Sequence, residues 1–376
     1  MEVDPLKLRY MDEFRNPELI RKTLDEIERM IEPHEHFRIM EACGGHTYAI
    51  FHFGLQELLP KNIEFIHGPG CPVCVLPPGR VDEVLSIATK NHDVVFTAFG
   101  DVMRVPGKFG SPLNYKATGT DVRMIYSPLD ALNIAIKNPD KKVILFAIGF
   151  ETTAPSTAIT LLKAKELDID NFFVYSNHVK IVPVLQSILD EPNMRIDGFI
   201  GPGHASVIIG AHPYEMIAKQ YKKPVVISGF EPLDILQSIL MLIKQLKNGE
   251  AKVENQYKRV VLEEGNVSAL EIMDQVFENR PSFEWRGLGA IHDSALKLRP
   301  EFSKWDAEVY FNVEKINIEE NKDAKCGDVL KGLIKPNQCE LFGKVCNPDN
   351  PVGALMVSSE GACATYYNHL FSSMTT

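Results

Sequence analysis

The sequence has no long hydrophobic run. Its longest apolar stretches, such as residues 143–148, are far shorter than the roughly 20 residues that a membrane-spanning helix requires. The chain opens with Met-Glu-Val-Asp, which lacks the basic region and apolar core of a secretory signal. We therefore expect no membrane association, and we expect the protein to be cytoplasmic.

An excess of positive charge is also missing. The 376 residues carry a formal net charge of −10, and no block of Lys and Arg interrupts this acidic balance. Nucleic-acid-binding proteins carry basic patches, so no nucleic-acid partner is expected. No G-x-G-x-x-G follows a predicted strand and no G-x-x-x-x-G-K-[ST] occurs, so neither a dinucleotide site nor a nucleotide triphosphate site is supported. Radical chemistry on S-adenosylmethionine is disfavoured because the motif C-x₃-C-x₂-C is absent.

Seven cysteines are present, divided along the chain into groups of one, two and four. In a reducing compartment, cysteines of this kind are metal ligands or redox thiols rather than structural disulfides. The apolar fraction of 45% and the charged fraction of 24% are those of a globular protein. A chain of this length exceeds one ordinary core, so two or three domains are expected.

The segment Gly-Pro-Gly-Cys-Pro-Val-Cys at 68–74 places Cys71 and Cys74 with two residues between them, directly after a predicted strand. This spacing lets both sulfurs bind one metal ion or close a small disulfide ring. A helix that begins after the first cysteine would stabilise its thiolate. The alternative is a buried, inert pair of small residues, which does not require glycine and proline on both sides.

The first cysteine follows another strand-like run, at residues 37–42. Cys43 and His46 stand at positions i and i+3 around two glycines, which allow a tight turn and a close approach to a ligand. At the start of a helix, this spacing offers a thiolate and an imidazole to one metal ion. The alternatives are a small packing residue at position 43 and a helix-capping or core histidine at position 46.

Near-continuous apolar strands alternate with helices through the first two thirds of the chain. This pattern predicts an α/β fold with parallel sheets covered on both faces. The tripeptide Gly-Phe-Glu occurs twice between a buried strand and a helix, ending at Glu151 and Glu231, and His204 opens another helix after a strand. Ligand crevices of open α/β sheets lie at this edge. The alternative for each glutamate is that it merely complements the helix dipole.

The last third of the chain differs in composition and contains fewer buried strands, and residues 277–281 are predicted to end a helix. Its four cysteines match the ligand count of a [4Fe–4S] cluster or of a structural zinc site. The short C-x₂₋₄-C clips of zinc modules are absent, which favours the cluster over zinc and over four unrelated thiols. The four candidate ligands are Cys326, Cys339, Cys346 and Cys363.

Six segments carry a resemblance to a known family. They are Cys-Gly-Gly-His-Thr at 43–47, Gly-Pro-Gly-Cys-Pro-Val-Cys at 68–74, Phe-Glu-Thr-Thr at 150–153, Gly-Phe-Glu-Pro-Leu-Asp at 229–234, Trp-Arg-Gly-Leu-Gly at 285–289 and Ser-Ser-Glu-Gly-Ala-Cys at 358–363. In type and order they resemble the HypD family of [NiFe]-hydrogenase maturation factors, from about residue 41 to residue 363. The family usually has histidine at position 48, where this chain has Tyr48.

The resemblance implies a scaffold on which the Fe(CN)₂CO unit of the hydrogenase is built together with the chaperone HypC. It implies that HypE delivers cyanide as a thiocyanate on its own cysteine. By the same resemblance, Cys43 and His46 match the iron-site positions, Cys71 and Cys74 match a redox-active pair, and the four tail cysteines match the [4Fe–4S] ligands.

The fold implied by the resemblance has two α/β domains and a smaller cysteine-rich Fe–S domain similar to part of ferredoxin–thioredoxin reductase. We expect a helical segment at 1–35 that packs on the C-terminal domain, α/β domains at 36–138 and 139–247, and the cluster-bearing domain at 248–376. The protein is expected to be monomeric by itself.

Electron counting suggests how the thiols act. Moving cyanide from a thiocyanate to iron requires two electrons, which a dithiol supplies as it becomes a disulfide, whereas a [4Fe–4S] cluster passes one at a time. We expect Cys43, His46, Cys71 and Cys74 to converge on one crevice, with His204 and Glu231 as neighbouring proton-handling groups. The competing hypotheses are a stand-alone Fe–S thiol–disulfide reductase of the ferredoxin–thioredoxin reductase type and a structural zinc protein.

Overall fold

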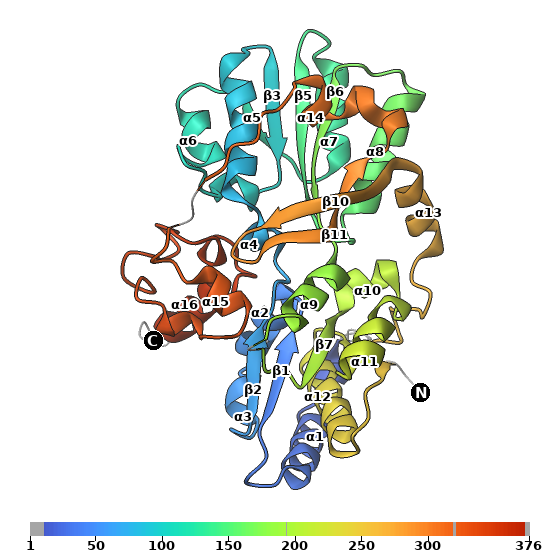
Figure 1. Cartoon of the computed structure of the whole chain (residues 1–376), viewed down its shortest axis with the longest axis vertical. Helices are drawn as coiled ribbons and strands as arrows, with labels where there is room; N and C mark the ends of the chain where they lie inside the picture. The colour runs from blue at the N-terminus through green and yellow to red at the C-terminus, as the bar shows by residue number, and fades with distance from the viewer. Residues whose placement is uncertain (1–10, 193, 319–320, 373–376) are drawn as a thin grey trace.

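Two parallel β-sheets, stacked end to end, form the framework of the molecule (Figure 1). The computed structural model describes residues 11–192, 194–318 and 321–372. The predicted α/β class with two parallel sheets is confirmed. No helix in these described ranges has the length and apolar character needed to cross a membrane.

The upper sheet in Figure 1 is built from one continuous stretch of chain. Its strand order is β4-β3-β5-β6, with all neighbours parallel. Apart from Lys142, every residue of β5 is buried, as expected for a central strand covered on both faces. The strands are β3 (Val94–Ala98), β4 (Val122–Met124), β5 (Lys142–Gly149) and β6 (Phe172–His178), and the helices around them are α5 (Pro78–Lys90), α6 (Pro112–Ala117), α7 (Pro128–Lys137) and α8 (Ala154–Glu166).

The lower sheet has the order β2-β1-β7-β8-β9 and is also parallel. Its strands are β1 (Phe37–Glu41), β2 (Ile63–His67), β7 (Gly198–Pro202), β8 (Val225–Ser228) and β9 (Val253–Asn255). The helices of this part are α1 (Pro17–Met30), α2 (Gly44–His52), α3 (Leu55–Leu58), α4 (Pro72–Val75), α9 (Ile181–Leu189), α10 (Gly203–Ile209), α11 (Glu215–Tyr221) and α12 (Pro232–Lys247).

The lower sheet draws strands from both predicted α/β segments, so the boundaries expected at 36–138 and 139–247 do not coincide with the sheets. The strands β1 and β2 precede the upper sheet in the chain, whereas β7, β8 and β9 follow it. Hydrophobic periodicity identifies strands but not their partners, and a chain that leaves one sheet and later returns to it has the same local pattern.

The N-terminal helix α1 packs on α12 of the lower sheet rather than on the cysteine-bearing segment that we expected. Ile27 of α1 joins the hydrophobic cluster that contains Ile235 and Ile239 of α12. An amphipathic helix covers whichever apolar face lies next to it, and the sequence of α1 does not identify that face. Residues 1–10 of the predicted segment 1–35 lie outside the described residues.

The last third of the chain passes the junction between the two sheets and then the upper sheet before it reaches the cysteines (Figure 1). It contains α13 (Val267–Val276), the antiparallel hairpin of β10 (Phe277–Trp285) and β11 (Gly289–Leu298), α14 (Ala307–Tyr310), α15 (Cys326–Leu330) and α16 (Ala362–Ser372). The prediction that residues 277–281 end a helix was wrong, because the helix ends at Val276 and pairing with β11 makes the next residues a strand. Short 3₁₀ helices lie at Asp12–Arg15, Val102–Arg104, His212–Tyr214, Pro300–Trp305, Pro336–Gln338 and Ala354–Met356.

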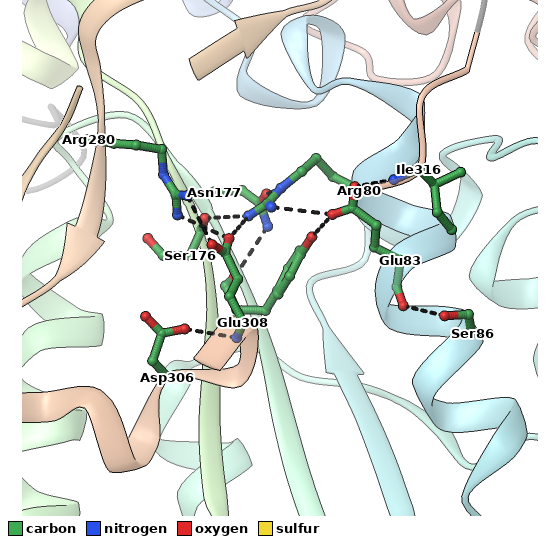
Figure 2. A network of polar contacts seen from close by, with 10 residues as sticks. Arg80, Glu83, Ser86, Ser176, Asn177, Arg280, Asp306, Glu308 and Ile316 are labelled. Atoms are coloured by element: carbon green, nitrogen blue, oxygen red, sulfur yellow. Dashed lines mark hydrogen bonds and ion pairs between the residues drawn. The ribbon is translucent and has the colours of Figure 1, made fainter. Parts of the chain in front are cut away.

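A buried ionic network holds this last third on the upper sheet (Figure 2). Glu308 of α14 accepts hydrogen bonds from both Arg80 of α5 and Arg280 of β10. The Arg80 guanidinium also lies over the ring of Tyr175 on β6, with its carbon 4.0 Å from the ring centroid. We call Arg80, Glu308 and Arg280 the arginine clamp, since this one carboxylate joins α5, α14 and β10.

One hydrophobic core is shared by both sheets and by the cysteine-bearing segment. It contains Met40 and Phe199 of the lower sheet, Phe96 and Phe146 of the upper sheet, and Leu355 of the C-terminal segment. The three parts are therefore packed into one body.

Candidate functional site

A cavity of about 370 Å³ lies where the carboxyl ends of the two sheets face each other. Its lining comes from the residues that directly follow β1, β2, β3, β5 and β7, together with Glu360 of the C-terminal segment. We call this space the front cavity. Ligand crevices of parallel α/β sheets lie at this edge, so its place agrees with the chemistry predicted from the sequence.

Cys43 stands at the wall of the front cavity, between β1 and α2. Burial, reinforced by the nearby Glu360 carboxyl, raises the pKa of the Cys43 thiol to about 12. Its sulfur lies 3.8 Å from Nδ1 of His204, which also lines the cavity from the start of α10. The thiol is thus neutral at physiological pH, and a metal ion would have to displace its proton to bind.

The C-x-x-C loop lies directly against Cys43. The register of β1 and β2 places Glu41 opposite His67, so the residues after both strands emerge side by side. Gly70 then passes so close that a Cβ atom on it would lie 2.3 Å from the Cα atom of Cys43. This close approach explains the glycine at position 70.

Cys71 and Cys74 form a disulfide with their Cα atoms 5.2 Å apart. The ring closes over the short helix α4, whose N-cap is Cys71. Both side chains are buried, with exposed fractions of 4% and 1%. A Cβ atom on Gly361 would lie 3.1 Å from the Cys74 sulfur, so the disulfide borders the segment that leads to Cys363.

His46 does not line the front cavity. It is fully buried, and its Nε2 lies 3.2 Å and 3.0 Å from the carbonyl oxygens of Ser228 and Gly229. Its ring stacks on Phe230 with centroids 4.5 Å apart, and Phe230 also stacks on His204 at 4.0 Å. Burial lowers the pKa of His46 to about 4. The imidazole is therefore neutral and connects α2 to the loop after β8.

The two glutamates that follow Gly-Phe differ in their surroundings. Glu231 is the N-cap of α12 and forms an ion pair with Arg15, whose Nε lies 2.5 Å from Oε2, and it does not line the front cavity. Glu151 is buried next to the front cavity, and burial raises the pKa of its carboxyl to about 7. Both glutamates occupy the same position between a strand and a helix, and only tertiary contacts distinguish them.

Two acids that we had not singled out also line the front cavity: Asp101, which follows β3, and Glu360. Burial, and then the Asp101 carboxylate, raise the pKa of Glu360. Glu360 lies within the Ser-Ser-Glu-Gly-Ala-Cys segment, so that motif could have identified it. Tyr48, in contrast, is 49% exposed and stacks on His52 at the surface.

The four tail cysteines line one small cavity of about 20 Å³, in apolar surroundings that include Phe342 and Met356. Burial, and then the other three thiols, raise the pKa of Cys363. Among the described residues, no three His, Cys, Asp or Glu side chains come close enough to hold a single metal ion. The residues do fit a [4Fe–4S] cluster, because such a cluster takes four thiolates, each on a different iron.

Comparison with known proteins identifies the relatives of this chain. A family model named HypD and described as the Hydrogenase formation hypA family matches residues 18–370. The Hydrogenase maturation factor HypD of Escherichia coli (strain K12) is 49% identical over 367 residues, which cover 96% of this chain and 98% of the relative. The protein of that name from Rhodobacter capsulatus is 50% identical over 371 residues, with 96% and 98% covered, and that from Azotobacter vinelandii is 48% identical over 366, with 96% of both covered.

Proposed function

This chain belongs to the HypD family of hydrogenase maturation factors, and we propose that it is the redox-active scaffold on which the Fe(CN)₂CO unit of [NiFe]-hydrogenase is assembled. In this proposal the iron unit is cargo that passes through the front cavity. The chaperone HypC shares the iron, HypE supplies cyanide from a cysteine thiocyanate, and assembly takes place in the cytoplasm on a monomer of this chain.

The observation that carries the proposal is the contact between Cys43 and the C-x-x-C loop at the front cavity. A single thiolate from this chain holds iron without filling its coordination sphere, which leaves positions for cyanide and carbon monoxide. Gly70 brings the two-electron group Cys71–Cys74 beside that thiolate. Iron binding and cyanide cleavage can thus occur in one place.

The electron and proton balance of the step is as follows. The S–C bond of a thiocyanate R–S–CN breaks, cyanide binds Fe(II), and two protein thiols become a disulfide. Per cyanide, R–S–CN, Fe(II) and two thiols give Fe–CN, R–SH, one disulfide and one free proton. Iron keeps its oxidation state, the thiols supply both electrons, and the Cys71–Cys74 disulfide in the structure corresponds to the spent form.

A route for restoring the dithiol is supported by the C-terminal segment. Gly361 lies against Cys74 and Gly353 against Cys326, so residues 353–361 connect the disulfide to the four-cysteine cavity. Cys326, Cys339, Cys346 and Cys363 would hold the [4Fe–4S] cluster, which when bound supplies one electron at a time. The chain's own part is to keep both sulfur centres buried and adjacent.

The remaining predicted residues receive narrower roles in this proposal. His204, beside the Cys43 sulfur, orients that thiol toward the front cavity. His46 and Glu231 act as positioning residues, the former through Phe230 and the latter through the start of α12. Neither is needed as an iron ligand.

The competing hypotheses are less well supported. A reductase that acts on other proteins gives no use for Cys43, which lines the front cavity against the C-x-x-C loop. A structural zinc site gives no use for Cys43 or for the front cavity.

Infrared spectroscopy of the chain purified with HypC, HypE and iron tests the proposal, since cyanide and carbonyl stretches fall in a window where protein is transparent. We expect cyanide bands with the wild type and none with Cys43→Ser. We expect Cys74→Ser, with its iron–sulfur content unchanged, to lose cyanide transfer. Unchanged transfer in Cys74→Ser would rule out the dithiol as the electron store.

A further inference from the structure

A second, larger cavity of about 690 Å³ lies on the other side of the wall that closes the front cavity. We call it the back groove. Its lining comes from α9, α13 and the β10–β11 hairpin, with Ile209 and Pro213 from the region of α10. Nothing in the proposed function uses this space.

Two chain segments form the wall between the front cavity and the back groove, and each of them lines both spaces. In the loop after β5, Phe150 and Thr152 line the front cavity, whereas Glu151 between them lines the back groove. At the start of α9, Ile181 lines the front cavity and its neighbours Lys180 and Val182 line the back groove. The wall is therefore about one residue thick at Glu151.

The Glu151 carboxyl is the polar group inside this wall. Its side chain is 4% exposed. One oxygen, Oε1, accepts a hydrogen bond of 3.0 Å from the backbone N–H of Ile181, and the other, Oε2, is buried with no hydrogen-bond partner. A buried carboxyl oxygen without a partner is costly, so its presence calls for an explanation other than packing.

A buried hydroxyl pair lies next to residues 202–205, which contribute to the lining of the front cavity. Ser206 and Tyr214 are both fully buried, and the Ser206 hydroxyl donates to the Tyr214 hydroxyl at 3.1 Å. Burial raises the pKa of Tyr214 well above its usual value, and both the Glu151 carboxyl and the Cys43 thiol raise it further. The Tyr214 hydroxyl is therefore within electrostatic reach of both groups.

The proposed chemistry requires protons to cross this region. Each cyanide transfer releases one proton into the front cavity, and reduction of the buried disulfide to two thiols consumes two. In the proposed function, HypC and HypE bring iron and thiocyanate to the front cavity, and while bound they cover its opening. A second connection to solvent is then needed, and hydroxyl and carboxyl groups, with one intervening water where necessary, can provide it.

We infer that Glu151, together with Tyr214, carries protons between the front cavity and the back groove. Glu151 acts as a positioning and relay residue, since it does not touch the iron or the cyanide. The inference rests on the proposed function, because that function creates the demand for protons.

The charges around Glu151 are compatible with this role. Burial raises the pKa of its carboxyl to about 7, near the pH at which a relay group loads and unloads with equal ease, and Lys180 partly offsets this rise. The other charged groups on the back groove are Lys180, Asp274, Glu278 and Arg299. Asp274 pairs with Arg299, Glu278 pairs with Lys297, and the Lys180 ammonium donates to Asn279, so these three cations have partners other than Glu151.

Three variants separate the relay from a structural effect. Glu151→Gln removes the titrating group, Glu151→Asp keeps a carboxyl, and Tyr214→Phe removes only a hydroxyl. Glu278→Gln, which alters a rim residue of the same groove, is the matched control. Cyanide transfer in the complex with HypC and HypE is followed by infrared spectroscopy from pH 5.5 to 8.5, in H₂O and in D₂O.

We expect the wild-type rate to follow one ionisation near pH 7 and to be slower in D₂O. Cyanide transfer in Glu151→Gln should be on the order of tenfold slower than in the wild type, with a rate that does not vary with pH. Transfer in Tyr214→Phe should also be slower, and Glu151→Asp should recover part of the wild-type rate. Glu278→Gln should match the wild type. If Glu151→Gln shows the same rate, pH profile and isotope effect as the wild type, the relay is overturned but the proposed function is not. If the wild-type protein forms no Fe–CN bands, both the proposed function and the relay are contradicted.

A second measurement does not depend on cyanide transfer. In the full chain labelled with ¹³C-glutamate, the carboxyl C=O band of a neutral buried glutamic acid should disappear as pH rises through about 7, and Glu151→Gln should lack this band. A wild type without such a titrating band would overturn the inference even if Glu151→Gln did not fold.

Discussion

Burial of the Glu151 carboxyl makes the stability of the protein depend on pH. The pKa of this group is raised from 4.5 to about 7, so the folded state binds its proton more tightly than the unfolded state. The stabilisation of the folded state by this protonated carboxyl is complete below about pH 4.5 and is lost as pH rises through 7. This change of stability with pH is opposite in sign to that of a salt-bridged carboxylate, which stabilises the folded state more as pH rises.

Between pH 4.5 and pH 8, we predict that the wild type loses on the order of 3 kcal/mol of unfolding free energy that Glu151→Gln does not lose. Urea unfolding of both proteins at pH 5 and pH 8 measures the difference. Glu278→Gln serves as the control and should follow the wild type. Equal pH dependence in Glu151→Gln and the wild type would contradict the assigned pKa.

At the residue scale, the sequence predicted cysteines and missed carboxylates. Thiols are rare and their spacing is informative, so Cys43 and the 71/74 pair stood out, and the structure brings them together. Asp101 and Glu360 are acids among many, and only their position at the front cavity distinguishes them. His46 and Glu231 were chosen from local spacing, and the structure turns both away from the front cavity.

At the scale of elements, the close contact between the loop after β2 and the start of α2 depends on one glycine. We predict that Gly70→Ala destabilises the protein by about 1–3 kcal/mol, because the added Cβ would meet the backbone of Cys43, which cannot move without shifting β1. The same change should displace the C-x-x-C loop and lower cyanide transfer.

Gly100→Ala, in the loop after β3, is the matched control. Its added Cβ would meet only the Met124 sulfur, at 3.5 Å, which is an ordinary contact. We expect its unfolding free energy to remain within about 0.5 kcal/mol of the wild type, as for most surface substitutions. Equal effects of the two substitutions in thermal unfolding would show that Gly70 is not needed for close packing.

The arginine clamp is the second element-scale feature with a measurable consequence. We predict that Glu308→Gln destabilises the protein by about 3 kcal/mol, because it leaves Arg80 and Arg280 facing each other with Arg80 buried. Chemical denaturation measures this cost. Glu215→Gln, which breaks an exposed pair with Lys219, should leave the unfolding free energy close to that of the wild type. A similarly small cost for Glu308→Gln would mean that the clamp does not hold α14 in place.

Local signals predicted most helices and parallel strands but not the hairpin. Ser127 and Pro128 are a local signal for the start of α7, since capping depends on neighbouring residues. The β10–β11 hairpin was missed because its two strands are stabilised by each other and by packing of β11 against β6 and α9, and neither effect is visible in a short window of sequence.

At the scale of the whole molecule, the shared core predicts a single unfolding transition. Residues of both sheets and of the cysteine-bearing segment belong to one buried cluster, so no part can unfold without exposing the apolar surface of another. Differential scanning calorimetry of the full chain should show one peak, and Glu308→Gln should move this peak as a whole. Two separate peaks would contradict the shared core.

The pairing of strands into sheets lies beyond what this sequence could reveal. Each strand reads as a buried parallel strand, and consecutive βα units suggest consecutive neighbours. In the structure β1 pairs with β2 and also with β7, and all four strands of the upper sheet lie between β1 and β7 in the chain. Only the packing of the complete chain distinguishes the two arrangements.

The split of the lower sheet has a consequence for how the protein is made. On the ribosome, β1 and β2 emerge with Cys43, Cys71 and Cys74 before any of the strands that later flank them. The upper sheet, continuous in sequence, can form while these early segments still wait for β7. The nascent chain therefore presents these three thiols to the cell before it can bury them.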